Sequence, residues 1–132
     1  MEKSTHLRTP IKRARGLGSS HSGTGHFWLQ RLSALALIPL SMWFMVVLLT
    51  RLIHADAASI GQWLHHPLVA LAMAALILAL FIHARLGIQT IIEDYIHNHV
   101  KKIIALLMLN IFTLGLGGAS LMAIIKLHFV GI

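Results

Sequence analysis

Two long stretches of this chain carry no charged side chain. Residues 32–50 and 103–125 contain no Asp, Glu, Lys or Arg. As a helix, about 20 predominantly apolar residues are enough to cross the hydrocarbon core of a bilayer. Because 57% of the 132 residues are hydrophobic and only 11% are charged, the chain also has more apolar surface than a water-soluble domain of this length can bury. We therefore predict that both stretches span a membrane.

A third apolar stretch lies between the first two. It is uninterrupted over residues 67–82 and continues, with polar interruptions, to Ile92. We interpret it as a full span whose interruptions serve function. The alternative is a re-entrant or interfacial segment, because the uninterrupted part is shorter than a complete span. The predicted fold class is an all-α integral membrane protein with three transmembrane helices, at about residues 28–52, 66–94 and 102–128.

Basic side chains gather on one side of the predicted spans. The cytoplasmic flanks of membrane proteins carry the excess of Lys and Arg. The amino end and the connection between the second and third spans contain Lys3, Arg8, Lys12, Arg13, Arg15, Arg31, Arg85, Lys101 and Lys102. The opposite side has Arg51 and Lys126. We therefore place the amino terminus in the cytoplasm, with residues 1–26 as a basic tail and residues 27–132 as the membrane anchor domain.

The net charge of +7 does not indicate nucleic acid binding. The basic residues flank membrane spans and form no patch interleaved with aromatic side chains. Membrane topology and attraction to anionic lipid explain them better. The sequence contains no cysteine, so these residues provide neither a disulfide nor thiolate ligands for an iron–sulfur cluster.

Helical spacing aligns a set of mostly small or polar residues along the second span. The set recurs every three or four residues and consists of Ala72, Leu76, Ala79, His83, Gly87, Thr90 and Asp94. Small side chains on either side of His83 leave room for a bulky, flat group, and Gly87 permits close backbone approach. We expect that a haem fits there.

His83 itself has two interpretations. Neutral imidazole is a common ligand of haem iron, and a histidine within an apolar span is costly without a partner. The alternative is a histidine hydrogen-bonded to a neighbouring helix, and spacing leaves both open. The other nine histidines lie in the tail, in loops or near span ends. If the haem has two histidine ligands, the second must therefore come from another chain.

Polar residues return at the predicted cytoplasmic end of the second span. Tyr95 is either an interfacial anchor or a hydroxyl donor to a quinone carbonyl. Arg85 is expected either to reach phosphate headgroups or to pair with a haem propionate. Spacing does not decide between these roles.

The third span and the first loop add packing expectations. Asn110 and Thr113 are expected to point inward and hydrogen-bond a neighbouring helix. Small residues at Gly115, Ala119 and Ala123 recur every four positions, a pattern that favours close helix packing. Between the first two spans, residues 59–66 are expected to form one interfacial turn anchored by its tryptophan.

Two blocks resemble a known family. The first is His83-Ala84-x-x-Gly87 followed by Asp94-Tyr95, and the second is Gly-His-Phe-Trp-Leu-Gln-Arg-Leu-Ser-Ala at residues 25–34. Both are similar to the hydrophobic membrane anchor subunit of succinate dehydrogenase (respiratory complex II) in its smaller, D-type form. The resemblance runs from residue 17 to the end, although the third span is similar only in hydropathy.

The resemblance implies roles for individual residues. His83 is expected to be an axial ligand of haem b, and so to bind its iron. Tyr95 is expected to hydrogen-bond ubiquinone, with Asp94 supporting the quinone site. Arg31 is placed near the site through its local block. The sequence motifs of the companion C-type anchor are absent here, which favours the D-type, and the second haem ligand is then expected on that companion.

The implied function is that of half of a two-subunit membrane anchor. Partners would be a C-type cytochrome b anchor subunit, an iron–sulfur subunit and a flavoprotein subunit, in a bacterial inner membrane in preference to a mitochondrial one. The chain alone is expected to be non-catalytic, because it lacks a dinucleotide-binding fingerprint and cluster ligands. The alternatives are a haem b anchor of fumarate reductase or another quinone-linked dehydrogenase, and a small ion-conducting protein with His83, Arg85 and Asp94 as a relay.

Overall fold

The computed structural model describes residues 11 and 23–130, and residues 23–130 consist almost entirely of helix. The helices are α2 (Gly23–Thr50), the short 3-10 helix η2 (Leu52–His54), α3 (Ala57–Leu64), α4 (Pro67–Tyr95) and α5 (His99–Phe129). Three of them, α2, α4 and α5, are long and apolar enough to cross a membrane. The predicted fold class of three transmembrane helices is confirmed. Most of the predicted basic tail lies outside the described residues.

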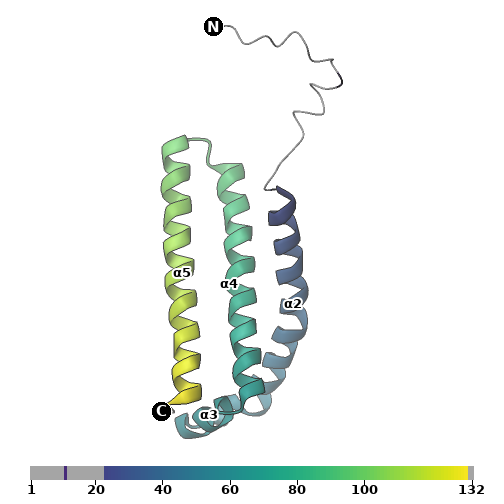
Figure 1. Cartoon of the computed structure of the whole chain (residues 1–132), viewed down its shortest axis with the longest axis vertical. Helices are drawn as coiled ribbons and strands as arrows, with labels where there is room; N and C mark the ends of the chain where they lie inside the picture. The colour runs from purple at the N-terminus through teal and green to yellow at the C-terminus, as the bar shows by residue number, and fades with distance from the viewer. Residues whose placement is uncertain (1–10, 12–22, 131–132) are drawn as a thin grey trace.

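The three long helices lie side by side with α4 in the middle (Figure 1), and α2 and α5 each pack along it. The start of α2 and the α4–α5 connection lie at one end of the molecule, whereas α3 and the end of α5 lie at the other. This arrangement is the one that three successive crossings require. The cytoplasmic position of the first end remains a prediction from the distribution of charge.

The second span is one complete helix. Helix α4 runs without a break for 29 residues, with Pro67 in its first turn. A proline is tolerated there because the N–H that it lacks has no partner within the helix. Polar residues such as Thr90, whose Oγ1 donates to the carbonyl of Leu86 (3.0 Å), remain within regular helix. The polar interruptions therefore leave α4 long enough for a full crossing.

The predicted interfacial turn is helix α3, and its start is capped by a carboxylate. Oδ1 of Asp56 accepts a hydrogen bond from the backbone N–H of Ser59 (3.0 Å). Hydrogen bonds from the side chain and backbone of Ser59 lower the pKa of Asp56. Such a cap satisfies a backbone donor that the first turn of a helix leaves unpaired.

Contacts from two long helices hold α3 in place. Trp63 stacks on Trp43 of α2, with ring centroids 6.0 Å apart. Leu64 is buried, and Nδ1 of His128 on α5 donates to its carbonyl (2.9 Å). Helix α3 thus connects the ends of α2 and α5, although α4 separates them along their length.

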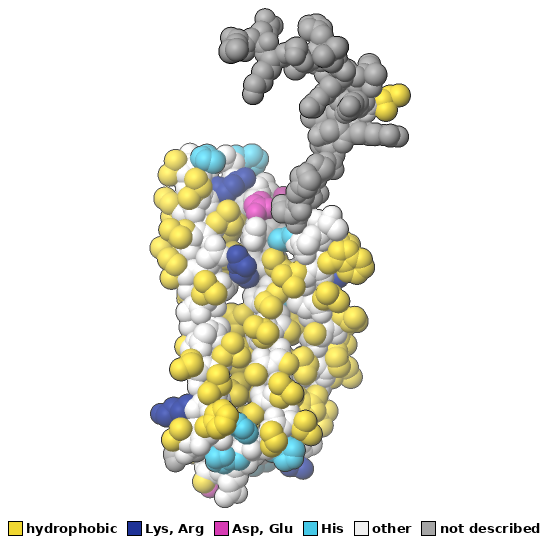
Figure 2. All heavy atoms as spheres, viewed as in Figure 1, with side chains coloured by type: hydrophobic (Ala, Val, Ile, Leu, Met, Phe, Trp, Pro, Cys, Tyr) yellow, Lys and Arg dark blue, Asp and Glu magenta, His cyan; other side chains and the backbone are white. Residues whose placement is uncertain are grey.

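The core of this chain is thin. The buried apolar side chains are Leu64, Ala70, Ala79, Leu86, Leu109 and Ile124, and among the described residues no large side chain is fully buried. Hydrophobic side chains cover the middle of the face in Figure 2, while charged and histidine side chains lie mostly toward its two ends. A row of three helices leaves broad apolar faces for lipid or for other membrane helices.

Candidate functional site

His83 of α4 lies against Ser33 of α2. Nδ1 of the imidazole is 3.2 Å from Oγ of Ser33. Ser33 is the buried residue of α2, with 6% of its surface exposed, and its Oγ also lies 3.0 Å from the carbonyl oxygen of Gln30. The histidine is therefore hydrogen-bonded to a neighbouring helix, which is one of the two interpretations that the sequence leaves open.

This hydrogen bond uses only one of the two ring nitrogens. Among the described residues, no hydrogen bond involves Nε2 of His83, and the side chain is partly exposed. An imidazole that binds a metal through one nitrogen commonly hydrogen-bonds through the other. The two interpretations of His83 are thus compatible.

Gly87, one turn after His83, faces α2. A Cβ atom built on Gly87 would lie 3.7 Å from Nε2 of Gln30. Part of the space that the sequence pattern assigns to a flat group is therefore used by α2 itself. Gly87 lies where α2 and α4 pack together, at ordinary van der Waals distance from the Gln30 side chain.

Next to this contact lies a cavity of about 450 Å³ between α2 and α4, lined by both polar and apolar residues. Its lining residues are Gly23, Gly25, His26, Leu29, Arg85, Leu86, Gln89 and Glu93. Two buried side-chain atoms, Nε2 of His26 and Oε1 of Gln30, have no hydrogen-bond partner within the described part of the chain.

Sequence reasoning about single residues missed His26, Gln30 and Ser33. A signal for them exists, because their spacing of four and then three positions places them on one face of a helix that is otherwise mainly apolar. All three belong to the block of residues 25–34 that carries the family resemblance.

Arg85 is tied to α5. Its Nε donates to Oδ1 of Asn110 (2.8 Å), so the expected inward hydrogen bond of Asn110 is confirmed. Thr113 is buried, but its hydroxyl donates to the carbonyl of Leu109 on its own helix (2.7 Å). The expected bond from Thr113 to a neighbouring helix is therefore wrong, because a threonine hydroxyl within a helix can reach the carbonyl one turn back.

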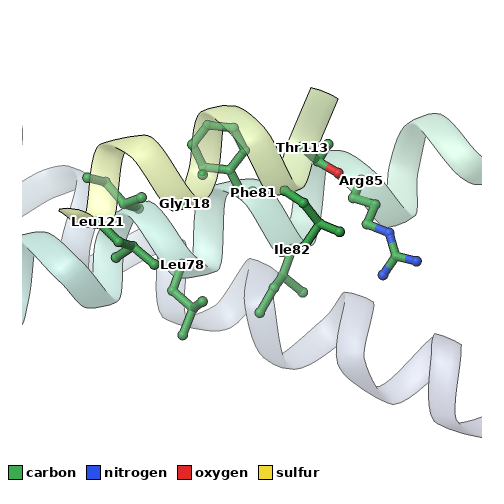
Figure 3. A pocket seen from close by; sticks show the side chains of 10 residues that line it. Leu78, Phe81, Ile82, Arg85, Thr113, Gly118 and Leu121 are labelled. Carbon is green, nitrogen blue, oxygen red and sulfur yellow. The ribbon is translucent and has the colours of Figure 1, made fainter. Parts of the chain in front are cut away.

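An apolar groove of about 250 Å³ runs between α4 and α5 (Figure 3). Phe81 and Ile82 of α4 line it with Thr113 and Gly118 of α5, and the guanidinium group of Arg85 lies at one end. This groove is on a different side of α4 from His83, because positions 83 and 85 differ by about 200° around a helix.

The glycine that packs α5 on α4 is Gly117. It is buried, and a Cβ atom built there would lie 3.2 Å from the ring of Phe81. Gly115, Ala119 and Ala123 are exposed. The stripe predicted to favour close packing therefore makes no such contact with α4, since it lies on another face of α5.

Asp94 and Tyr95 lie at the end of α4, away from His83. His83 and Tyr95 are twelve positions apart on the helix, which corresponds to about 18 Å along the axis and about 120° around it. Tyr95 is 79% exposed. Neither Asp94 nor Tyr95 makes a side-chain hydrogen bond to another described residue, whereas the neighbouring Glu93 accepts one from Gln89 (2.7 Å).

Arg31 contacts an aromatic ring of its own helix. Its guanidinium carbon lies 5.2 Å from the ring centroid of Phe27. Two positions separate it from Ser33, so the two side chains leave α2 in different directions. The structure therefore brings Ser33 to His83, and Arg31 lies elsewhere on α2.

The described side chains could provide one axial ligand of a haem. Within residues 23–130 no group of three or more His, Cys, Asp or Glu side chains can enclose a metal ion. Haem iron needs only axial ligands from protein. The imidazole of His83, with Nδ1 held and Nε2 unpaired among the described residues, has the chemistry of one such ligand.

Residues 5–117 match the family described as "Succinate dehydrogenase/Fumarate reductase transmembrane subunit". The chain belongs to this family. A succinate dehydrogenase hydrophobic membrane anchor subunit of Paracoccus denitrificans is 35% identical over 94 residues, which cover 71% of this chain and 72% of that protein. The subunit of the same description from Rickettsia bellii is 33% identical over 111 residues, which cover 82% of this chain and 88% of that protein.

Membership of the family confirms the resemblance found in the sequence. The chain is a multi-pass membrane anchor subunit of succinate dehydrogenase, and an anchor subunit works in a complex with other subunits. The matched region contains Ser33, His83 and Tyr95 together.

Proposed function

We propose that this chain supplies one axial ligand of haem b, through His83, and part of the ubiquinone-reduction site, through Tyr95. The observation that carries the proposal is the environment of His83 in the central helix. A buried hydroxyl holds one ring nitrogen, and the other makes no hydrogen bond to a described residue. A histidine at membrane depth is expected to have a functional partner.

When bound, the haem supplies one-electron oxidation and reduction at its iron. Nε2 of His83 would hold the iron from this chain. Within the described residues the side-chain hydrogen bond of Arg85 uses Nε, so its terminal guanidinium nitrogens would be available to a carboxylate such as a haem propionate. Arg31 is proposed to lie at the periphery of the site.

At the end of α4, the hydroxyl of Tyr95 would donate to a carbonyl of ubiquinone. Asp94 supports the same network, and acid groups or water supply the protons that a reduced quinone takes up. A ligand site is a concave pocket, whereas Tyr95 is largely exposed here. The remaining walls of the quinone site would therefore come from other subunits.

The proposed partners are a C-type cytochrome b anchor subunit, an iron–sulfur subunit and a flavoprotein subunit. The C-type anchor would provide the second haem ligand and cover part of the exposed apolar surface. Electrons from succinate would reach the quinone through the iron–sulfur subunit, in a bacterial inner membrane with the start of α2 on the cytoplasmic side.

The test is replacement of His83 in the complex purified in mild detergent. His83→Leu is expected to alter or abolish the reduced-minus-oxidised b-type spectrum, because leucine has no donor atom. His97→Leu is the matched control, since His97 is exposed in the α4–α5 connection and its loss should leave the spectrum intact. An unchanged spectrum in His83→Leu would contradict the ligand assignment.

The second candidate concerns the direction of the reaction: the assembled complex would reduce fumarate with quinol, because the family description names fumarate reductase too. The spans would use the same chemistry in either case. The rates of quinone reduction by succinate and of fumarate reduction by quinol in the purified complex decide between them.

A further inference from the structure

We propose that Ser33 is a positioning residue for the iron ligand: its hydroxyl fixes His83 in the tautomer that carries the proton on Nδ1 and leaves the lone pair of Nε2 available for iron. The inference rests on the proposed ligand role of His83. It adds a residue on α2 to a site otherwise assigned to α4.

Two contacts meet at the hydroxyl oxygen of Ser33. One is to the carbonyl oxygen of Gln30 (3.0 Å), and the other is to Nδ1 of His83 (3.2 Å). A serine hydroxyl has one proton to donate and lone pairs to accept with, whereas a carbonyl oxygen can only accept. Both contacts are hydrogen bonds only if the serine proton goes to Gln30 and the proton of the second bond belongs to His83.

The opposite tautomer breaks this arrangement. If the proton were on Nε2, Nδ1 would be an acceptor, and Ser33 would face two acceptors with one proton. One of the two contacts would then lack a hydrogen. An iron ligand needs an unprotonated nitrogen, so the arrangement that satisfies Ser33 is also the one that prepares Nε2 for the metal.

The buried position of Ser33 strengthens its effect on the tautomer of His83. With 6% of its surface exposed it is the buried residue of α2, and its bond to Gln30 fixes the direction of its lone pairs. Because α2 and α4 pack together, the hydroxyl also fixes the plane of the imidazole relative to α2. Acceptance of the Nδ1 proton raises the basicity of the ring and so favours the ferric iron.

Substitution of Ser33 in the assembled complex tests the inference. Ser33→Ala removes the hydrogen-bond acceptor. Ser33→Cys nearly keeps the side-chain volume, but its sulfur is only a weak acceptor. Ser33→Thr keeps the hydroxyl. Ser41→Ala is the matched control, because Ser41 is an exposed serine of α2 whose hydroxyl bonds to its own helix at Leu37 and Ile38.

The primary readout is the midpoint potential of the haem, with its electron paramagnetic resonance spectrum. Ser33→Ala and Ser33→Cys are expected to raise the midpoint potential of the haem by up to about 59 mV. For a one-electron couple this lowers the ferric-to-ferrous ratio at a fixed ambient potential by up to about tenfold. They should also lose haem more readily on dilution in detergent. Ser33→Thr and Ser41→Ala should match the parent complex.

The outcomes separate the two proposals. Unshifted potential and spectra in Ser33→Ala or Ser33→Cys would overturn the role of Ser33, even if His83→Leu loses the b-type spectrum. If His83→Leu keeps its spectrum, the proposed function falls first and the inference falls with it. An equal shift in Ser41→Ala would show a general effect of helix α2, and would also overturn the inference.

Discussion

At the scale of single residues, the polar side chains of the long helices mostly find partners within the chain. His83 reaches Ser33, Arg85 reaches Asn110, and Thr113 turns back to its own helix. Lipid offers no hydrogen bonds, so each unsatisfied group in it is costly. Nε2 of His26 and Oε1 of Gln30 are exceptions among the described residues. Their helix face is therefore where we expect bound groups or partner residues.

Tyr95 gives a residue-scale prediction. In the complex, Tyr95→Phe is expected to slow ubiquinone reduction by at least about tenfold, because loss of a hydrogen bond of about 1.4 kcal/mol made in the transition state costs that factor. Succinate-dependent reduction of an artificial dye should remain near the parent rate, since dye reduction does not need the quinone site. Equal loss of both activities would instead indicate misassembly.

At the scale of helices, α4 is the element on which the others depend. Helix α2 approaches it at Gly87 and His83, and α5 approaches it at Gly117. Small residues let helices come close in lipid, where van der Waals packing replaces the hydrophobic effect. The α2–α4 contact borders the cavity beside His83, and the α4–α5 contact borders the apolar groove.

Gly117 allows the α4–α5 contact to be tested. Gly117→Val should destabilise the complex by about 1–3 kcal/mol, because the added carbons overpack against Phe81. Gly118→Val is the control, since no atom lies within 4 Å of a Cβ built at Gly118. Thermal denaturation in detergent, followed by loss of succinate-dependent ubiquinone reduction, measures the difference. Equal stability of the two variants would contradict the packing assignment.

Helix α3 gives a prediction of pH dependence. The folded pKa of Asp56 is lowered by its bonds with Ser59, so its contribution to α3 is full above the unfolded pKa and is lost as pH falls through the folded pKa. The stacked Trp43–Trp63 pair should therefore change its fluorescence below about pH 4. Asp56→Asn keeps a capping oxygen but does not titrate, so this part of the change should vanish. Its persistence would assign the change to other groups.

At the scale of the whole molecule, the chain does not enclose its own site. The buried side chains are few, and large residues such as Met42, Phe112 and Leu114 are exposed. Tyr95 is largely exposed at the end of α4, and the proposed haem ligation uses the single side chain of His83. The structure has the form of one part of a larger membrane assembly, as expected for an anchor subunit.

Expression of this chain alone tests that dependence. Without its partner subunits it is expected to accumulate poorly in membranes and to show no b-type spectrum, because a second axial ligand and a covering surface are missing. Co-expression with the companion anchor subunit should restore both. A stable, haem-loaded chain in the absence of partners would contradict the shared site.

Part of the candidate site could be predicted from the sequence. The sequence predicts a role for His83 because a histidine inside an apolar span is conspicuous, and for Tyr95 and Asp94 because a family motif contains them; these roles remain proposals. Ser33 was not assigned a role, because serine is common in membrane helices and its partner lies 50 positions away. Arg85 was linked to headgroups or a propionate, but its bond to Asn110 joins two spans and was not predicted.

The number and extent of the spans follow from the sequence alone, because the length of an apolar stretch controls whether a helix can cross a bilayer. Which face of each helix meets which neighbour becomes visible in the packed helices alone. In water an apolar stripe marks the inward face of a helix, but in lipid all faces are apolar and the stripe disappears. The packing roles of Gly115 and Gly117, and the pairing of Ser33 with His83, therefore had to come from the arrangement of helices in space.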